Sequence, residues 1–152
     1  ERTRIQTGHE DDGYARIGVL HGRTIATVPE SGWLVVDDLT GSGGHILESF
    51  LHLAPGILPV IEDDRILLGS TSWVLVPFGF GAPPEVRSDG YAPEVGVRRP
   101  SQTLVFRRVA KLPVRCGYFL GLRTFSRLEW ISGSTVRLDE LQLNLPLFWE
   151  YV

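Results

Sequence analysis

Residues 33–56, WLVVDDLTGSGGHILESFLHLAPG, are the stretch of the chain that decides the fold. An apolar run ends at Asp37 and Asp38, a Gly/Ser-rich turn covers 40–44, and a second hydrophobic segment continues to Gly56. Glycine supplies the positive φ that a tight connection between strands requires. The stretch therefore predicts two buried strands joined by a flexible turn.

The second segment, HILESFLHL at 45–53, also fits one face of a helix. A helix would gather His45 and His52 on its polar face, whereas a strand would send them to opposite faces. We interpret the segment as a strand, because nine residues are few for a helix and the glycine-rich turn offers the preceding strand an antiparallel partner.

The rest of the chain consists of short segments separated by turn signals, with little that is typical of a helix. This pattern predicts an all-β fold, an antiparallel β-sandwich, with residues 1–152 as a single domain. Apolar residues change phase between Leu138 and Leu141, which predicts a turn or bulge at 139–140. The Gly/Pro cluster at 79–84 predicts a loop inside the domain. The expected strands cover 14–21, 22–28, 33–38, 45–53, 65–68, 72–80, 103–111 and 114–120, the first two paired with each other.

Composition excludes several classes of partner. The net charge of −3 gives no basic footprint for nucleic acid. The longest apolar runs, around 73–80 and 114–122, are far shorter than the roughly 20 residues of a membrane-spanning helix. The only cysteine, Cys116, alternates with apolar neighbours, so we expect a buried and inert thiol. The chain contains no methionine and shows no signal peptide at its start, so we expect a segment upstream of Glu1.

Motifs on both sides of the central stretch carry a family resemblance. Upstream are Asp12-Gly13-Tyr14 and His21-Gly22-Arg23; downstream are the segments YAPEVGV at 91–97 and LPVR at 112–115. In this order and spacing, roughly residues 9–121 resemble the C-terminal β-sheet region of the heparinase II/III-like polysaccharide lyases. Residues 122–152 lie outside the resemblance, and we expect them to form additional strands.

The resemblance implies a function for a larger protein. Such a protein joins an N-terminal helical α/α-toroid domain to the β-sandwich and cleaves an acidic, uronic-acid-containing polysaccharide such as a glycosaminoglycan by β-elimination. It implies a bacterial protein of the periplasm or the extracellular space. The partners implied for this chain are the toroid domain of the same protein and the acidic polysaccharide.

Four histidines carry most of the available chemistry: His9, His21, His45 and His52. None shows the spacing that lets two imidazoles of one local element reach the same metal. Ordinary hydrogen-bonded or solvent-facing histidines are the simpler interpretation. In heparinase II-like enzymes the β-sandwich holds a structural zinc, and the resemblance implies His52 as a ligand. The other ligands of that site belong to a segment preceding this chain.

The charged and aromatic residues allow functional and structural interpretations. Asp37 and Asp38 point to opposite faces of a strand, so they cannot flank one bond, and turn hydrogen bonds explain them better. The acidic run at 62–64 is expected in a solvated loop. The arginine pairs at 98–99 and 107–108 offer a groove for an acidic glycan, although alternation leaves only one of each pair on a given face. The tryptophans, which stack on sugars in some proteins, are expected mostly in the core: Trp33, Trp73, Trp130 and Trp149.

No catalytic residue is assigned. β-Elimination requires a base, an acid and a group that neutralises the uronate carboxylate. The resembled family places these groups in the toroid domain and in an early Arg/His/Asn-containing motif, which has no match here. We therefore expect the isolated chain to be inactive, with its substrate-binding residues unassigned. The alternative is a carbohydrate-binding or structural β-sandwich module of a cell-surface or polysaccharide-assembly protein.

Overall fold

The computed structural model describes residues 5–10, 12–125 and 127–145. Within these residues the chain forms thirteen strands and one short 3-10 helix, η1 (Asp12–Ile17). All strand pairs are antiparallel, and the strands form three sheets. The predicted all-β sandwich is confirmed, and no described helix has the length and apolar character needed to cross a membrane.

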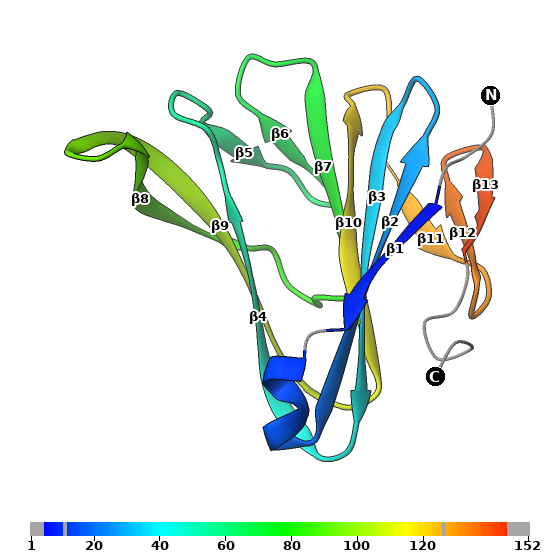
Figure 1. The fold of residues 1–152 in the computed structure, drawn as a ribbon. Coiled ribbons are helices and arrows are strands. Elements are labelled where there is room, and N and C mark those ends of the chain that lie inside the picture. Colours follow the sequence, from blue (N-terminus) through cyan, green and yellow to red (C-terminus); the bar gives the residue numbers. More distant parts are fainter. Residues whose placement is uncertain (1–4, 11, 126, 146–152) are drawn as a thin grey trace.

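The three sheets form three layers (Figure 1). The central sheet has seven strands in the order β1 (Ile5–Glu10), β2 (Val19–Val28), β3 (Gly32–Gly41), β10 (Val114–Leu122), β7 (Trp73–Phe78), β6 (Ile66–Leu68) and β5 (Pro59–Ile61). We call the second sheet the outer sheet; its order is β4 (Gly44–His52), β9 (Val97–Lys111) and β8 (Glu85–Glu94). The third sheet consists of β11 (Leu128–Trp130), β12 (Thr135–Leu138) and β13 (Leu141–Asn144).

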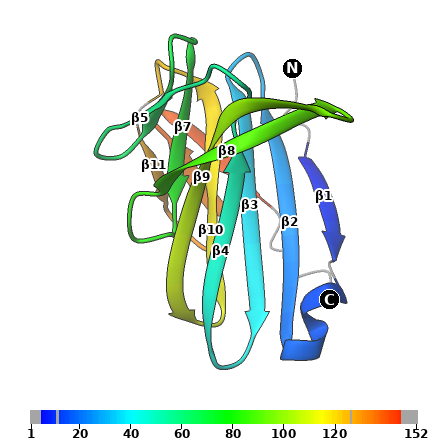
Figure 2. The ribbon, with the colours of Figure 1, turned by 90° about the vertical axis from the view of Figure 1, so that its left-hand side faces the viewer.

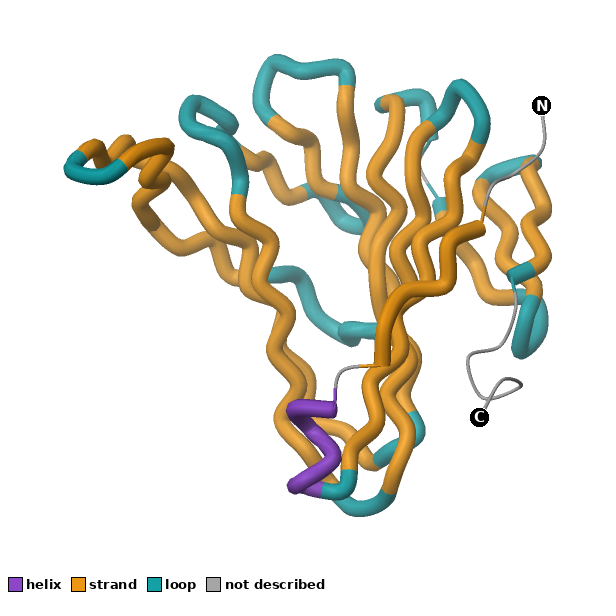
Figure 3. The backbone as a smooth tube through the Cα atoms, in the orientation of Figure 1, coloured by secondary structure: helices purple, strands orange, loops and turns teal. Residues whose placement is uncertain are grey.

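The outer and central sheets form a wedge. They come together near the turn between β3 and β4 and diverge towards the opposite end, where the hairpin of β8 and β9 leans away (Figures 1 and 3). Seen from the side, β4 and β9 lie in front of β3 and β10 (Figure 2). This arrangement leaves part of the inner face of the central sheet without a covering strand.

Strand alternation builds two hydrophobic cores on the two faces of the central sheet. Leu34 and Val36 of β3 point towards the third sheet, where they join Val136 and Leu138 in one core. The other core lies on the outer-sheet side and is built around buried apolar residues from both sheets: Ile66, Leu75, Phe80, Leu104, Phe106 and Cys116.

The central stretch folds differently from the predicted hairpin. β3 pairs with β2 on one edge and β10 on the other, so neither edge is left for β4, which pairs with β9 instead. Gly41 has a φ of 133°, and a Cβ there would collide with the Gly18 carbonyl oxygen, so glycine allows the chain to turn out of the sheet. The predicted burial of β4 is also wrong, because its residues are alternately exposed and half-buried.

Among the other predicted elements, the turns and loops are confirmed, whereas several strands are wrong or missing. The paired strands expected at 14–21 and 22–28 are wrong: η1 occupies the start, Gly18 at φ 73° follows it, and β2 is one continuous strand. The prediction missed β1, β5 and β8. The turn expected at 139–140 is confirmed, because Asp139 has a φ of 49° between β12 and β13. The loop expected at 79–84 is confirmed between β7 and β8.

Candidate functional site

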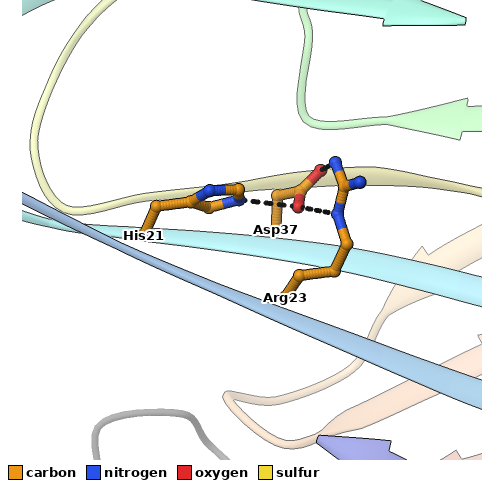
Figure 4. A network of polar contacts seen from close by, with 3 residues as sticks. All are labelled: His21, Arg23 and Asp37. Carbon is orange, nitrogen blue, oxygen red and sulfur yellow. Dashed lines mark hydrogen bonds and ion pairs between the residues drawn. The ribbon is translucent and has the colours of Figure 1, made fainter. Parts of the chain in front are cut away.

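A charged cluster lies on the face of the central sheet that points to the outer sheet. It consists of His21 and Arg23 from β2 and Asp37 from β3 (Figure 4). The Asp37 side chain is only 6% exposed and accepts three hydrogen bonds. His21 donates from Nε2 to Oδ1 at 2.9 Å, and Arg23 donates from Nε to Oδ1 at 2.6 Å and from Nη2 to Oδ2 at 2.9 Å.

Strand register brings these residues together. Arg23 lies directly opposite Asp37, and His21, two positions earlier on β2, points to the same face. Burial alone would raise the pKa of Asp37, but the hydrogen bonds from His21 and Arg23 outweigh it and hold the pKa below its usual range. The hydrogen bond to Asp37 likewise raises the pKa of Arg23. The cluster is therefore an ionised pair with a histidine held in a fixed orientation.

The cluster borders a pocket. The pocket volume is about 480 Å³, and its walls are η1, β2, β3 and the edge of β4. Tyr14 and Ile17 of η1 line one side, and each is about half exposed. The Tyr14 ring meets the His21 ring edge-on, with the ring centroids 6.1 Å apart. The lining of the pocket mixes apolar side chains with polar and charged ones, Glu48 of β4 among them. A pocket that combines apolar area with a few oriented polar groups is typical of a small-ligand site.

A second pocket, of about 550 Å³, is lined mainly by loops and carries several acidic residues. Its lining includes the acidic run at 62–64, which Arg65 accompanies in an ion pair with Glu62 at 2.7 Å. Arg127 lies on its other side. Three consecutive acidic residues make this pocket the less suitable of the two for an anionic ligand.

The thiol of Cys116 lines the first pocket but is inert. Its side chain is buried beneath the cluster, opposite Asp37 in the register of β3 and β10. Burial, reinforced by the negative charge of Asp37, raises the pKa of Cys116 to about 12. The thiolate is therefore negligible at neutral pH, as expected from its apolar neighbours.

His52 belongs to a separate cluster on the outer sheet. Its Nδ1 lies 2.9 Å from Oγ1 of Thr103 and 3.2 Å from Oδ2 of Asp89. Thr103 donates to Asp89 at 2.7 Å, so its oxygen and the carboxylate both accept from the imidazole and the proton is on Nδ1. The His52 side chain is 69% exposed.

The residues around His52 do not fit a complete zinc site. His52 and Asp89 are two groups of the ligand type, whereas a structural zinc takes four. No group of three such side chains gathers anywhere in the part of the chain that the structure describes. The implied role of His52 as a ligand stays a prediction about a larger protein.

Of the two remaining histidines, only His45 has a described side chain, and its position is an ordinary structural one. His45 reaches the carbonyl oxygen of Ser42 through Nε2 at 2.9 Å, within the turn after β3. His9 belongs to β1, but its side chain lies outside the described residues. Among the described histidine side chains, His21 therefore belongs to the charged cluster, and His52 belongs to a separate cluster with Thr103 and Asp89.

Asp37 and Asp38 do point to opposite faces, but turn hydrogen bonds do not explain them. Both are buried in the middle of β3. Asp38 pairs with Arg115 of β10, whose Nε lies 2.5 Å from Oδ1, and Arg115 also bonds the carbonyl of Gly133 and stacks over Trp130 at 4.5 Å. Asp38 thereby helps to connect the central sheet to the third sheet.

The arginine pair at 107–108 divides between the two faces of the outer sheet, as alternation requires. Arg107 lies 3.8 Å from Glu48, opposite it on β4. Arg108 donates to the carbonyl oxygen of Gly79. Neither joins the charged cluster. The arginine of the charged cluster is Arg23, which stands alone in the sequence. Only its register opposite Asp37 could have indicated that it binds this carboxylate.

The tryptophans also differ from the expected core positions. Trp33 is 43% exposed and stacks on Trp73, with ring centroids 5.5 Å apart and planes at 18°. Trp130 is partly buried against the core shared with the third sheet and meets Phe78 edge-on. Trp149 lies outside the described residues.

Comparisons with known proteins agree with the fold. The family model described as Heparinase II/III-like, C-terminal, matches residues 1–121. The structure is similar to a crystal structure of heparinase III, with a TM-score of 0.72 and 14% identity over 94% of this chain and 27% of that one. It is also similar to heparan sulfate lyase HepC from Pedobacter heparinus, with a TM-score of 0.66 and 12% identity over 95% of this chain and 26% of that one. No curated protein matches. The chain spans about a quarter of the length of these two structures.

Proposed function

Because this chain belongs to the heparinase II/III-like C-terminal domain family, we propose that it is the β-sandwich domain of a polysaccharide lyase acting on uronic-acid-containing glycans. The observation that carries this proposal is the extent of the similarity. The fold matches heparinase III over 94% of this chain, yet it corresponds to only 27% of that protein. A domain of this size is one part of such an enzyme.

β-Elimination needs three groups held together at one uronate. A base removes the proton next to the carboxylate, an acid protonates the leaving oxygen, and a third group neutralises the carboxylate charge. The charged cluster does not supply this set, because Nε2 of His21 is occupied by Asp37 and the Cys116 thiol is not ionised at neutral pH. The chain acts as a scaffold, and a helical toroid domain of the same protein supplies the missing groups.

This proposal also assigns partners and a location. The protein partner is the N-terminal helical domain of the same protein, and the ligand is an acidic polysaccharide. A bacterial enzyme that meets such a polymer works in the periplasm or outside the cell. We assign the whole protein to one of these two compartments.

One observation favours the alternative function, a carbohydrate-binding module without elimination chemistry. The exposed Trp33 is held rigidly on a sheet face, as aromatic residues that contact sugars often are. Binding of glycans is compatible with both functions. Only a measurement of elimination activity distinguishes the lyase domain from the binding module.

The decisive experiment measures the unsaturated uronate that elimination creates, by its ultraviolet absorbance. Incubated with heparin, heparan sulfate, alginate or hyaluronan, the chain alone should give no increase, whereas a protein that also contains the helical domain should give a steady one. Failure of the longer protein on every substrate would favour the binding module. Turnover by the chain alone that is lost on replacing His21, His45 or His52 would contradict the scaffold assignment.

A further inference from the structure

The uncovered part of the central sheet carries an aromatic pair. Trp33 is the second residue of β3, and Trp73 is the first of β7. Trp73 packs against the core on the outer-sheet side, and Trp33 points the same way because its neighbour Leu34 belongs to the core on the opposite face. The outer sheet covers this face only in part (Figure 3). Although β3 lies in the interior of the sheet, Trp33 is 43% exposed. An exposed indole on a central strand has an unfavourable contact with water unless something else covers it.

Stacking fixes the orientation of the Trp33 ring. Its centroid lies 5.5 Å from that of Trp73 at an interplanar angle of 18°, so one face of the indole is occupied by a neighbouring ring. Leu120 lies opposite Trp33 in the register and packs against the core on the same face. The ring has few conformations to lose on binding, and its second face is the surface open to a ligand.

The same face of the sheet leads from Trp33 to the charged cluster. Residues two apart on a strand share a face, so Trp33, Val35 and Asp37 follow one another along β3. Arg23 is paired with Asp37, about 13 Å from Trp33 along the extended strand. Tyr118, opposite Val35, lies between the two ends. These residues therefore form one row along this face of the sheet, with the exposed Trp33 and Arg23 at its two ends.

Arg23 has hydrogen-bonding capacity left for a ligand. It uses Nε and Nη2 for Asp37, and among the described residues Nη1 contacts no acceptor. Its side chain is 44% exposed and borders the pocket of about 480 Å³. An anion placed there would meet the guanidinium, with the His21 ring beside it.

We propose that this row is a binding site for an acidic oligosaccharide. A pyranose ring packs its C–H face against the open face of Trp33, and a carboxylate or sulfate of the same chain reaches Arg23 and His21. The choice of an acidic glycan as ligand rests on the proposed function. The site itself rests on the stacked indoles, the pocket and Nη1 of Arg23, which has no acceptor among the described residues. Trp33 supplies apolar contact area and Arg23 selects for negative charge.

The test compares binding of oligosaccharides to the chain and its variants by calorimetry. The probes are heparan sulfate hexasaccharides and a neutral cellohexaose of equal length. We expect Trp33→Ala to weaken binding of the acidic probe about tenfold or more, and Trp33→Phe to restore part of it. Tyr91→Ala is the matched control, because Tyr91 is 48% exposed on the outer sheet, and its removal should leave the affinity unchanged.

Arg23 is tested separately because its loss also affects Asp37. Arg23→Lys keeps the charge, and circular dichroism with a melting curve establishes that it folds. We expect weaker binding of the acidic probe, because a Lys ammonium paired with Asp37 lacks the second donor group of the guanidinium. The dependence on salt should be unchanged because the charge stays, and binding of the neutral probe should not change. Arg87→Gln is the control, because Arg87 is an exposed arginine paired with Glu85 at 2.8 Å on the outer sheet.

The outcomes separate this site from the proposed function. Wild-type affinity in Trp33→Ala, equal losses in Tyr91→Ala, or equal affinity for both probes would overturn the site. Absence of binding to the chain, with elimination intact in the longer protein, would overturn the site and leave the lyase assignment standing. Binding that depends on Trp33 in a protein without elimination activity would support the site and reject the lyase.

Discussion

At the scale of single residues, two adjacent aspartates connect three strands. Asp37 joins β3 to β2 through Arg23, and Asp38 joins β3 to β10 through Arg115. Alternation along a strand predicted from the sequence that the two carboxylates face opposite ways. Their partners could not be predicted, because Arg115 lies 77 residues from Asp38 and becomes its neighbour only through the sheet register.

Replacement of Asp37 by asparagine should destabilise the fold by about 1–3 kcal/mol, because charge-assisted hydrogen bonds to Arg23 and His21 are lost. The pKa of Asp37 is lowered in the folded state, so its contribution is present above the ordinary value of 3.8 and is lost as the pH falls through the folded value. The difference between wild type and Asp37→Asn in urea unfolding should be constant near neutral pH and shrink below about pH 4.

Asp64 provides the control for this prediction. It is exposed in the loop before β6, so Asp64→Asn should change the unfolding free energy by less than about 0.5 kcal/mol at any pH. A difference for Asp37→Asn that grows as the pH falls would contradict the assigned direction of the pKa shift.

At the scale of elements, β4 shows why the predicted hairpin failed. The local sequence correctly indicated a turn followed by a strand. Both edges of β3 are already paired, however, and one of its partners, β10, lies far along the chain. β4 instead lies at the edge of the outer sheet. Its outward side chains include Ile46 and Phe50, which are 59% and 50% exposed, and Val109 beside them is 75% exposed.

An exposed apolar edge strand predicts self-association of the isolated chain. Phe50→Lys should reduce the fraction of associated protein in sedimentation velocity at high concentration, because a charge on the edge opposes pairing with a second strand. Its melting temperature should stay close to that of the wild type, since the side chain is already half exposed. Val95→Lys adds the same charge at a fully exposed turn, and an equal decrease there would show that net charge alone is responsible.

At the scale of the whole molecule, the sequence predicted the class of the fold better than its connections. Alternation and turn residues indicated a β-sandwich, and the motifs around the central stretch indicated the heparinase II/III-like C-terminal family. The three layers, the wedge and the row from Trp33 to Arg23 depend on which strands become neighbours, which no local pattern determines. The resemblance singled out His52, but neither its exposure on the outer sheet nor its contact with Asp89 could be predicted from the local sequence.

The isolated chain should hold zinc poorly. His52 and Asp89 offer two ligand-type groups, and two ligands give a site far weaker than the usual four. After dialysis against a chelator, elemental analysis should find much less than one equivalent of zinc. One equivalent retained, and lost in His52→Ala, would show that the chain completes a site, and His21 and His45 would be the next ligands to test.

The position of β10 also affects how the protein is made. β10 (Val114–Leu122) inserts between β3 and β7, so residues up to 113 form two unfinished halves of the central sheet. During synthesis, the facing edges of β3 and β7 stay open until the ribosome has released β10. Sheets that depend on such distant pairing form slowly and are vulnerable before closure. A nascent chain of this protein therefore needs protection, by a chaperone or by a preceding folded domain, until its last central strand emerges.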